Sequence, residues 1–266
     1  MDSSTYLQRI HYPGTPAPSL AELAALQLAH LHSVPFENLD IHLGRPIVLD
    51  LARIYTKIVH DGRGGFCYEL NGLFAWLLGQ LGFSVTLLSA GVARHGEDIT
   101  KRGAFGPEYD HLTLLVRCPQ KPRERWLVDV GFGEGFQVPL SLDTTELQAE
   151  AIDNYQIRHE ADYHVLYRGD ETGSWSPQYR FNLQPRQFTE FAGMCRYHQT
   201  SPESSFTHQR VITQVMPGGR VTLSASQELR RLILTSNGLR QEQILPDEAA
   251  WRQALLEHFG VSLPQP

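Results

Sequence analysis

The spacing of apolar residues changes near position 83, and this change constrains the fold more than any other feature of the chain. Before it the pattern is helical: Ser19 and Glu22 form a capping box, and leucines from Leu20 onward recur until Pro35. After it come short stretches rich in valine, tyrosine, leucine and tryptophan, separated by Gly, Pro and Asp turns. These stretches are Phe83 to Arg94, His111 to Arg117, Arg125 to Gly131, Tyr155 to Arg168 and Trp175 to Leu183. We therefore predict a helical first part followed by a sheet or barrel.

The pattern becomes mixed after Pro185. We expect a short helical stretch near Phe188 to Arg196 and strands on either side of Pro217 to Gly219. A last helix should run from about Asp247 to Phe259, with Gly260 as its C-terminal stop. A chain of 266 residues can form one large compact unit or a few small, closely packed ones.

Charge and cysteine usage exclude several classes of protein. A formal net charge of -6 and the lack of any lysine or arginine run argue against nucleic acid or an anionic membrane as the main partner. Three widely spaced cysteines fit neither a disulfide framework nor a paired-cysteine zinc site. His30 and His32 have no carboxylate or cysteine partner, so no metal is predicted. No secretion signal or long apolar run stands out, and we expect a cytoplasmic protein.

Cys67 is the residue that says most about chemistry. It follows two glycines and a phenylalanine in the run Arg63 to Phe74, which reads RGGFCYELNGLF. Apolar residues from Leu70 to Leu81 then recur at helical spacing, and Gly82 supplies a stop. A thiol at a helix N-terminus faces unpaired backbone N–H groups, which favour the thiolate, and the glycines allow close approach to a substrate. Alternatively, Cys67 is a small buried hydrophobe, as free cysteines in cores often are.

A nucleophilic cysteine needs a base and a group that orients it, and His111 and Asp129 are the best candidates. Each lies in an apolar strand, and the intervening Cys118 to Pro122 resembles a hairpin turn. With Gln120 at the centre, Leu115 opposes Arg125, Thr113 opposes Leu127, and His111 opposes Asp129. Opposed residues share a face, with Cβ atoms roughly 4.5 to 5.5 Å apart. A bulge or a two-residue slip would leave the two side chains as diagonal neighbours.

Other readings of these residues remain open. Asp129 could cap a turn or pair with an arginine, and His111 could be an ordinary sheet histidine. Asp110 should point to the opposite face of the strand from His111 and is the weaker orienting group. The string GFGEGF from Gly131 to Phe136 is not a dinucleotide fingerprint, because extended chain rather than a helix follows it. Its glycines should let the backbone approach a ligand or turn a barrel corner.

With these residues in view, the chain resembles the arylamine N-acetyltransferases over most of its length. The matching stretches, in the expected order, are Tyr6 to Ile10, Val34 to Asp40, Arg63 to Phe74, the strand that starts at His111, Val128 to Gly133, and Thr200 to Phe206. The cysteine and aspartate motifs are specific, and the combination of several motifs in the expected order leaves little room for chance.

The resemblance implies an α+β fold with a core similar to that of papain-like cysteine proteases. It implies a helical bundle over residues 1–83 that carries the nucleophile, a β-barrel over 84–185 that carries the histidine and aspartate, and an α/β lid over 186–266. It also implies a catalytic triad of Cys67, His111 and Asp129. Residues that match motif positions around the substrate and CoA cleft are Phe36, Asn71, Phe132, Gly133 and Phe206.

The reaction implied by the resemblance is acetyl transfer. Acetyl-CoA is the co-substrate, no cofactor is permanently bound, and the acceptor is an arylamine, arylhydrazine or arylhydroxylamine, as in xenobiotic metabolism. An amide synthase or a thiol hydrolase on the same triad is the alternative. This chain departs from the family's usual residues at two places in the cleft. Asp110 stands where a small hydroxyl residue is expected, and Met194 and Cys195 stand near a position that is often asparagine. The pattern does not select among the basic residues available for CoA phosphates, which include Arg45, Arg94, Arg102 and Arg220. Oligomeric state stays open.

Overall fold

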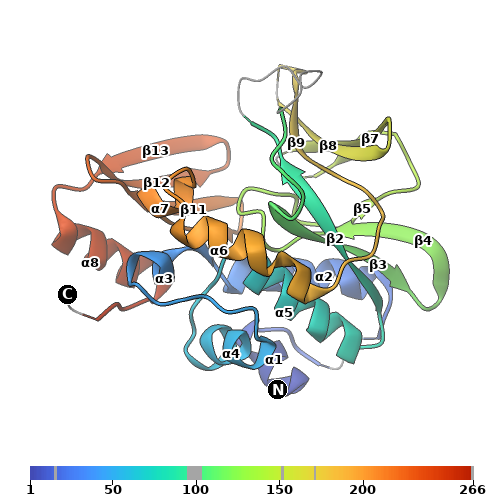
Figure 1. Cartoon of the computed structure of the whole chain (residues 1–266), viewed down its shortest axis with the longest axis horizontal. Helices are drawn as coiled ribbons and strands as arrows, with labels where there is room; N and C mark the ends of the chain where they lie inside the picture. Colours follow the sequence, from blue (N-terminus) through green and yellow to red (C-terminus); the bar gives the residue numbers. More distant parts are fainter. Residues whose placement is uncertain (15–16, 95–103, 151–152, 171, 265–266) are drawn as a thin grey trace.

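The fold was analysed in a computed structural model that describes residues 1–14, 17–94, 104–150, 153–170 and 172–264. Figure 1 shows a barrel-like sheet in green and yellow above the helices of the first part, with a second sheet and a last helix in orange and red beside them. The helices of the first part are α1 (Ser3–Arg9), α2 (Leu20–Ser33), α3 (Leu39–His42), α4 (Leu51–Tyr55), the π-helical turn η1 (Thr56–His60) and α5 (Cys67–Gln80). The prediction that the first eighty residues are mainly helical is confirmed.

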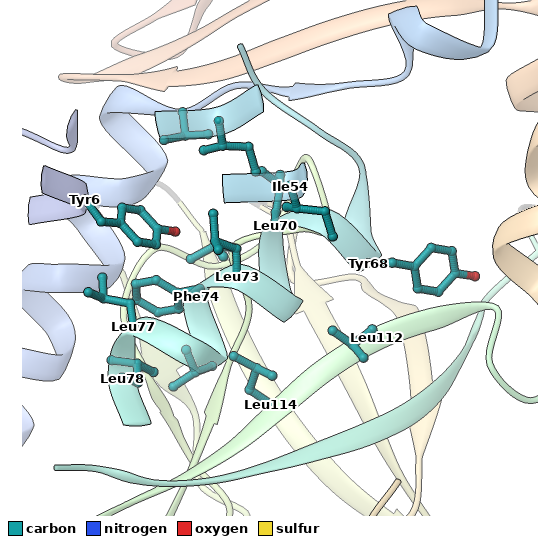
Figure 2. Close-up of a cluster of buried hydrophobic side chains, with 14 of the residues drawn as sticks. Tyr6, Ile54, Tyr68, Leu70, Leu73, Phe74, Leu77, Leu78, Leu112 and Leu114 are labelled. Atoms are coloured by element: carbon teal, nitrogen blue, oxygen red, sulfur yellow. The ribbon is translucent and has the colours of Figure 1, made fainter. Parts of the chain in front are cut away.

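Local signals set the ends of the two longest of these helices. The Ser19 hydroxyl caps α2 by accepting the backbone N–H of Glu22 at 3.3 Å. Helix α5 begins at Cys67 and is followed by Gly82 at φ +90°, a conformation that glycine adopts without strain. The apolar face of α5 is fully buried between α1, α4 and the strand that carries Leu112 and Leu114 (Figure 2). Its side chains are Leu70, Leu73, Phe74, Leu77 and Leu78. Helix α5 is therefore fixed on most of its sides.

The barrel-like sheet has eight strands, all antiparallel to their neighbours, in the order β5-β4-β3-β2-β9-β8-β7-β6. Their bounds are β2 (Ser84–Val92), β3 (His111–Cys118), β4 (Lys121–Val128), β5 (Leu140–Ser141), β6 (Gln148–Ala149), β7 (Asn154–Glu160), β8 (Tyr163–Gly169) and β9 (Trp175–Phe181). The Gln148 carboxamide bonds to both the backbone N–H and the carbonyl of Ser141, at 2.6 and 3.0 Å. A side chain thus links the two edge strands, and the sheet is nearly closed.

Two details of this sheet differ from the sequence prediction. The stretch Tyr155 to Arg168 forms two strands, because Ala161 turns the chain at φ +50°, a conformation that no glycine or asparagine signals there. The β3–β4 hairpin pairs Leu115 with Leu127, not with Arg125, and has an irregularity between Val116 and Cys118. The predicted register was therefore wrong by two residues, because a bulge takes up the difference near the turn. A two-residue slip keeps every side chain on its predicted face.

The second sheet has five strands in the order β1-β10-β11-β12-β13. They are β1 (Phe36–Glu37), β10 (Arg210–Met216), β11 (Gly219–Ala225), β12 (Arg230–Ser236) and β13 (Leu239–Ile244). Strands on either side of Pro217 to Gly219 are confirmed, whereas the β12–β13 hairpin was missed although Asn237 and Gly238 are a hairpin turn signal. The short strand β1 brings the Val34 to Asp40 segment to this sheet.

Helices flank the second sheet. The short helix η2 (Phe188–Phe191) leads into α6 (Ala192–Thr200) and α7 (Ser205–His208), close to the predicted stretch Phe188 to Arg196. The final helix α8 (Glu248–Phe259) ends at Gly260, at φ +65°, as predicted, and its Trp251 is buried against β11 and β12. Among the residues that the structure describes, no helix has the length and apolar character needed to cross a membrane.

Candidate active site

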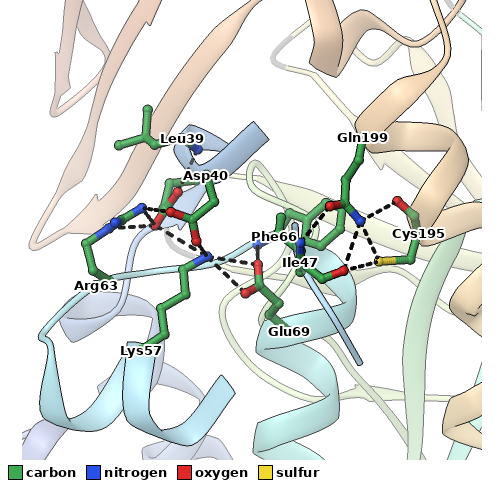
Figure 3. A network of polar contacts seen from close by, with 10 residues as sticks. Leu39, Asp40, Ile47, Lys57, Arg63, Phe66, Glu69, Cys195 and Gln199 are labelled. Carbon is green, nitrogen blue, oxygen red and sulfur yellow. Dashed lines mark hydrogen bonds and ion pairs between the residues drawn. The ribbon is translucent and has the colours of Figure 1, made fainter. Parts of the chain in front are cut away.

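Cys67 is the first residue of α5, and only 4% of its surface is exposed. The turn before it is held by the Glu69 carboxylate, which accepts the backbone N–H of Phe66 at 3.1 Å. Glu69 in turn binds the ammonium of Lys57 at 2.9 Å (Figure 3). The position of the thiol is therefore set by a carboxylate one turn into its own helix and by a lysine from η1.

Lys57 and Glu69 belong to a buried ion network at the N-terminal end of α5. Lys57 also contacts Asp40 at 2.8 Å, and Arg63 contacts Glu37 at 2.7 Å and Asp40 at 3.2 Å (Figure 3). The five charged side chains are between 0 and 13% exposed. Glu37 and Asp40 come from the Val34 to Asp40 segment, so this network joins two of the matching stretches in space.

Close packing requires the two glycines before Cys67. A Cβ added at Gly64 would lie 2.0 Å from the carbonyl oxygen of Pro35, and one at Gly65 would lie 2.8 Å from the Cβ of Glu69. The chain can pass between Pro35 and Glu69 only without side chains at both positions. That the glycines also bring the thiol and nearby backbone close to a substrate stays a prediction.

His111 and Asp129 meet despite the shifted register. His111 opens β3, Asp129 directly follows β4, and their Nε2 and Oδ2 atoms are 2.6 Å apart. Burial acts to raise the pKa of Asp129, but the His111 ring, the Asn71 amide and the Gly131 N–H hold it below its usual range. Asp129 is thus a carboxylate and accepts only, so Nε2 of His111 carries its hydrogen and Nδ1 is left free to accept one. Asp110 instead pairs with His198 at 3.2 Å.

Two further side chains hold the Asp129 carboxylate. Asn71 donates to Oδ1 at 2.8 Å and to the carbonyl of Leu112 at 2.6 Å, while its own Oδ1 accepts the N–H of Val130 at 2.9 Å. The hydroxyl of Tyr179 donates to Oδ2 at 3.1 Å, and its ring lies against the His111 ring with centroids 5.2 Å apart. Tyr179 comes from β9, far along the chain, and no sequence pattern marks it.

The environment of Cys67 differs from the sequence expectation in one respect. Burial raises the pKa of the thiol well above its usual value, and a backbone hydrogen bond from Leu112 opposes this only in part. The helix N-terminus therefore does not make an isolated thiolate favourable. A thiolate at this position needs a neighbouring cation, which an imidazolium formed by proton transfer would supply.

Cys67 and His111 line one cavity of about 370 Å³. Its walls include Phe36, Phe132, Gly133 and Phe206, four of the five residues expected around a substrate cleft. Asn71, the fifth, is fully buried behind Asp129 and is not part of the lining. His198, Thr213 and Thr222 also line the cavity and were not predicted. Within the part of the chain that the structure describes, no three His, Cys, Asp or Glu side chains are placed to hold a metal ion.

Comparison with known proteins agrees with this geometry. A family model described as N-acetyltransferase matches residues 19–266. The arylamine N-acetyltransferase of Mycolicibacterium smegmatis is 34% identical over 99% of this chain and 93% of its own length. The chain belongs to the arylamine N-acetyltransferase family. A relative from Salmonella typhimurium, named arylamine N-acetyltransferase / N-hydroxyarylamine O-acetyltransferase, is 32% identical over 97% of this chain and 88% of its own length.

A solved structure shares the fold. The Mycobacterium marinum arylamine N-acetyltransferase in complex with CoA has a TM-score of 0.88 and 31% identity, covering 97% of this chain and 92% of its own. Membership in the arylamine N-acetyltransferase family makes the protein an acetyl-CoA-dependent acyltransferase.

Gly131 lies where two parts of this arylamine N-acetyltransferase site touch. A Cβ added there would lie 2.8 Å from both the Cα of Cys67 and the amide nitrogen of Asn71. We expect Gly131→Ala to separate Cys67 from the His111–Asp129 pair, because neither the Cys67 backbone nor the Asn71 amide can yield without moving α5 or the hydrogen bond from Asn71 to Asp129. Overpacking of this kind costs about 1–3 kcal/mol, and a displacement of about 1 Å lowers acetyl transfer roughly 10²-fold. Urea unfolding and single-turnover acetylation measure the two effects.

Gly79→Ala is the matched control, because Gly79 lies on the exposed face of the same helix with nothing within 4 Å of an added Cβ. We expect this variant to gain about 0.5–1 kcal/mol of stability and to keep the parent rate. A Gly131→Ala protein with parent stability and rate would contradict the role assigned to this contact.

Proposed function

We propose that the protein transfers an acetyl group from acetyl-CoA to an arylamine, arylhydrazine or arylhydroxylamine through a thioester on Cys67. The observation that carries this proposal is the cavity that Cys67 and His111 both line, with Asp129 hydrogen-bonded to His111 from behind. The name of the Salmonella typhimurium relative, which includes hydroxyarylamines, and the CoA complex of the Mycobacterium marinum relative support the substrate classes.

In the proposed mechanism, Nδ1 of His111 takes the thiol proton of Cys67, and Asp129 stabilises the imidazolium that results. The thiolate attacks the thioester carbonyl, and backbone N–H groups of the first turn of α5 stabilise the oxyanion. The C–S bond to CoA breaks, CoA leaves with a proton from His111, and the acetyl group stays on Cys67. The acceptor amine then attacks the acetyl-enzyme and passes its proton to His111, the C–S bond to Cys67 breaks, and the acetylated amine leaves with the Cys67 thiolate and the His111 imidazolium restored. The kinetics are ping-pong.

Aromatic side chains favour a flat acceptor in this cavity. Phe36 and Phe206 lie with ring centroids 6.1 Å apart, and Phe132 packs edge-on against His111 at 5.2 Å. These rings offer apolar faces on which an aromatic amine can stack beside the acetyl group. We assign Phe36, Phe132, Gly133 and Phe206 to substrate and CoA binding, and Asn71 to positioning Asp129.

Several finer features belong to the same proposal. We propose structural units at residues 1–83, 84–185 and 186–266, a core similar to papain-like proteases, a cytoplasmic location and a role in xenobiotic metabolism. An amide synthase or thiol hydrolase would use the same triad, so only the acyl donor and acceptor distinguish these activities.

The test is to incubate the full-length protein with acetyl-CoA and no acceptor, and then to locate the acetyl group by peptide mass spectrometry. We expect one acetyl group on Cys67 and release of one equivalent of CoA, followed by loss of the label when an arylamine is added. Cys67→Ala should take up no label. Cys118→Ala is the matched control, because it removes a buried cysteine outside the cavity and should be labelled like the parent. An unlabelled parent protein would contradict the proposal.

A further inference from the structure

Asp110 lies in the wall of the candidate active-site cavity, which it shares with the reacting thiol. Two carboxylates, Asp110 and Glu134, line this cavity, and among the described residues no lysine or arginine does. Burial is the main cause of the raised pKa of the Cys67 thiol, and the charge of Asp110 raises that pKa further. A carboxylate at this position opposes formation of the thiolate, so the first half of the proposed reaction does not explain its presence.

The backbone before strand β3 sets the position of Asp110. The sequence predicted opposite faces of the strand for Asp110 and His111, yet both line the cavity, because Asp110 precedes β3 and lies outside its alternation. Tyr109 adopts φ +66°, a conformation that favours glycine and that a tyrosine keeps only where its surroundings hold it. Its N–H donates to the Ser89 hydroxyl at 2.6 Å, and its carbonyl accepts from the Tyr68 hydroxyl at 2.7 Å. The backbone that brings Asp110 to the cavity is therefore fixed by tertiary contacts.

Three neighbours hold the carboxylate group of Asp110 itself. Oδ2 accepts the backbone N–H of Val92 at 3.1 Å, and a Cβ added at Gly106 would lie only 2.0 Å from it. Oδ1 lies 3.2 Å from Nε2 of His198, whose Nδ1 lies 3.3 Å from the Ser204 hydroxyl. The negative group thus has a fixed place in the wall of a partly enclosed cavity, where a charge acts more strongly than it does in water.

The second half of the proposed reaction gives this charge a role. Once Cys67 is acetylated its sulfur is neutral, and His111 has passed its proton to CoA. The acceptor then meets Asp110 and Glu134 as the negative groups of the wall. A cationic or hydrogen-bond-donating group on the acceptor ring is attracted to a carboxylate, whereas a second carboxylate is repelled. Glu134 also lines two neighbouring cavities, so Asp110 is the residue whose charge acts on this one alone.

We propose that Asp110 determines the acceptor specificity of this protein. It favours aryl amines whose ring carries a cationic or hydrogen-bond-donating group over aryl amines whose ring carries a carboxylate. The inference rests on the proposed function, because it concerns the molecule that takes the acetyl group from Cys67. Asp110 stands where a small hydroxyl residue is expected in the family, so the specificity belongs to this chain and not to the triad.

The test compares three acceptors of nearly the same size: the cation 4-aminobenzamidine, the neutral 4-aminobenzamide and the anion 4-aminobenzoate. The full-length protein is acetylated with acetyl-CoA, freed of CoA and mixed with each acceptor, so that the rate reports on the acceptor step alone. Asp110→Asn keeps the shape of the side chain and removes its charge. We expect it to slow transfer to 4-aminobenzamidine about tenfold and to speed transfer to 4-aminobenzoate about tenfold. Transfer to 4-aminobenzamide should stay within about twofold of the parent rate.

Glu108→Gln is the matched control, because it removes the same charge at an exposed side chain that pairs with Arg186 and does not line the cavity. It should change none of the three rates. The 3-amino isomers of the acceptors repeat the test with the charged group closer to the reacting amine. Asp110→Ser takes the place of Asp110→Asn if that variant unfolds. In the unchanged parent, benzamidine should inhibit transfer to 4-aminobenzamide at about tenfold lower concentration than benzoate does.

Opposite changes with the cationic and anionic acceptors support the proposal. Equal changes with all three acceptors, or no change with any of them in either isomer, would show that His198 cancels the charge of Asp110 or that the charge does not reach the acceptor. The proposal would then be wrong, and acetyl transfer would stand. Benzoate that inhibits the parent better than benzamidine would also overturn it. A parent that is not acetylated on Cys67, or that transfers the acetyl group to none of these acceptors, would instead contradict the proposed function.

Discussion

Replacing Asp129 by asparagine should lower the rate of acetyl transfer about 10⁴-fold with little change in fold. Oδ1 of Asp129 accepts from Asn71 and from the Gly131 N–H, at 2.8 and 2.9 Å, so the oxygen of an asparagine would take that position. Its NH₂ group would then face Nε2 of His111. The ring would have to accept at Nε2 and carry its hydrogen on Nδ1, the tautomer that cannot take a proton from Cys67.

Single-turnover acetylation of Asp129→Asn by acetyl-CoA measures this effect, and thermal unfolding shows whether the variant is folded. Tyr179→Phe is the matched control, because it removes one hydrogen bond to Asp129 and leaves the carboxylate in place. We expect that control to lose no more than about tenfold. A folded Asp129→Asn protein that transfers acetyl groups at the parent rate would show that Asp129 does not orient His111.

Lys57→Met should be the most destabilising of the substitutions considered, at about 3–5 kcal/mol. Lys57 contacts Asp40 and Glu69 within 3 Å and Glu37 at 3.8 Å, all in a buried setting. Without Lys57, three carboxylates would share Arg63 as the remaining cation of the network. The loss of unfolding free energy should exceed the free energy that the missing contacts contribute, because at least one buried carboxylate would have no counter-ion.

The loss of stability caused by Lys57→Met should also depend on pH. Burial already raises the pKa of Glu69, and without Lys57 it should rise further. A folded-state pKa above the unfolded value gives stability that is present at low pH and is lost as the pH rises. The variant should therefore be less impaired near pH 5 than near pH 8, in urea unfolding at both values. Lys121→Met, which breaks an exposed ion pair with Glu124, should cost less than about 1 kcal/mol at either pH. Equal losses for the two variants would contradict this account of the network.

The sequence predicted the elements that depend on neighbouring residues. Leucine spacing and Gly82 identified α5, Ser19 identified the start of α2, and Gly260 identified the end of α8. Two errors have local causes as well. The turn at Ala161 has no glycine to mark it, and the bulge near Cys118 is not visible in the pattern of apolar residues. The Asn237 and Gly238 signal was present and was overlooked.

The predicted pairing of His111 with Asp129 is correct although the predicted register is wrong by two residues, and the reason is physical. Side chains alternate between faces along a strand, so a two-residue error keeps both groups on one face and leaves them as diagonal neighbours. The long reach of an imidazole and a carboxylate covers the remaining offset, and Nε2 of His111 lies 2.6 Å from Oδ2 of Asp129. A one-residue error would have put the two groups on opposite faces.

By itself the sequence determined the succession of a helical, a strand-rich and a mixed part, the family, and three residues with complementary chemistry, because caps, periodicity and motifs depend on neighbouring positions. Only the tertiary structure decided how these residues are held. It placed Asn71 and Tyr179 on Asp129, and Gly131 against the backbone of Cys67. Each of these contacts joins segments far apart in the chain, where register and packing set the distances and local pattern does not.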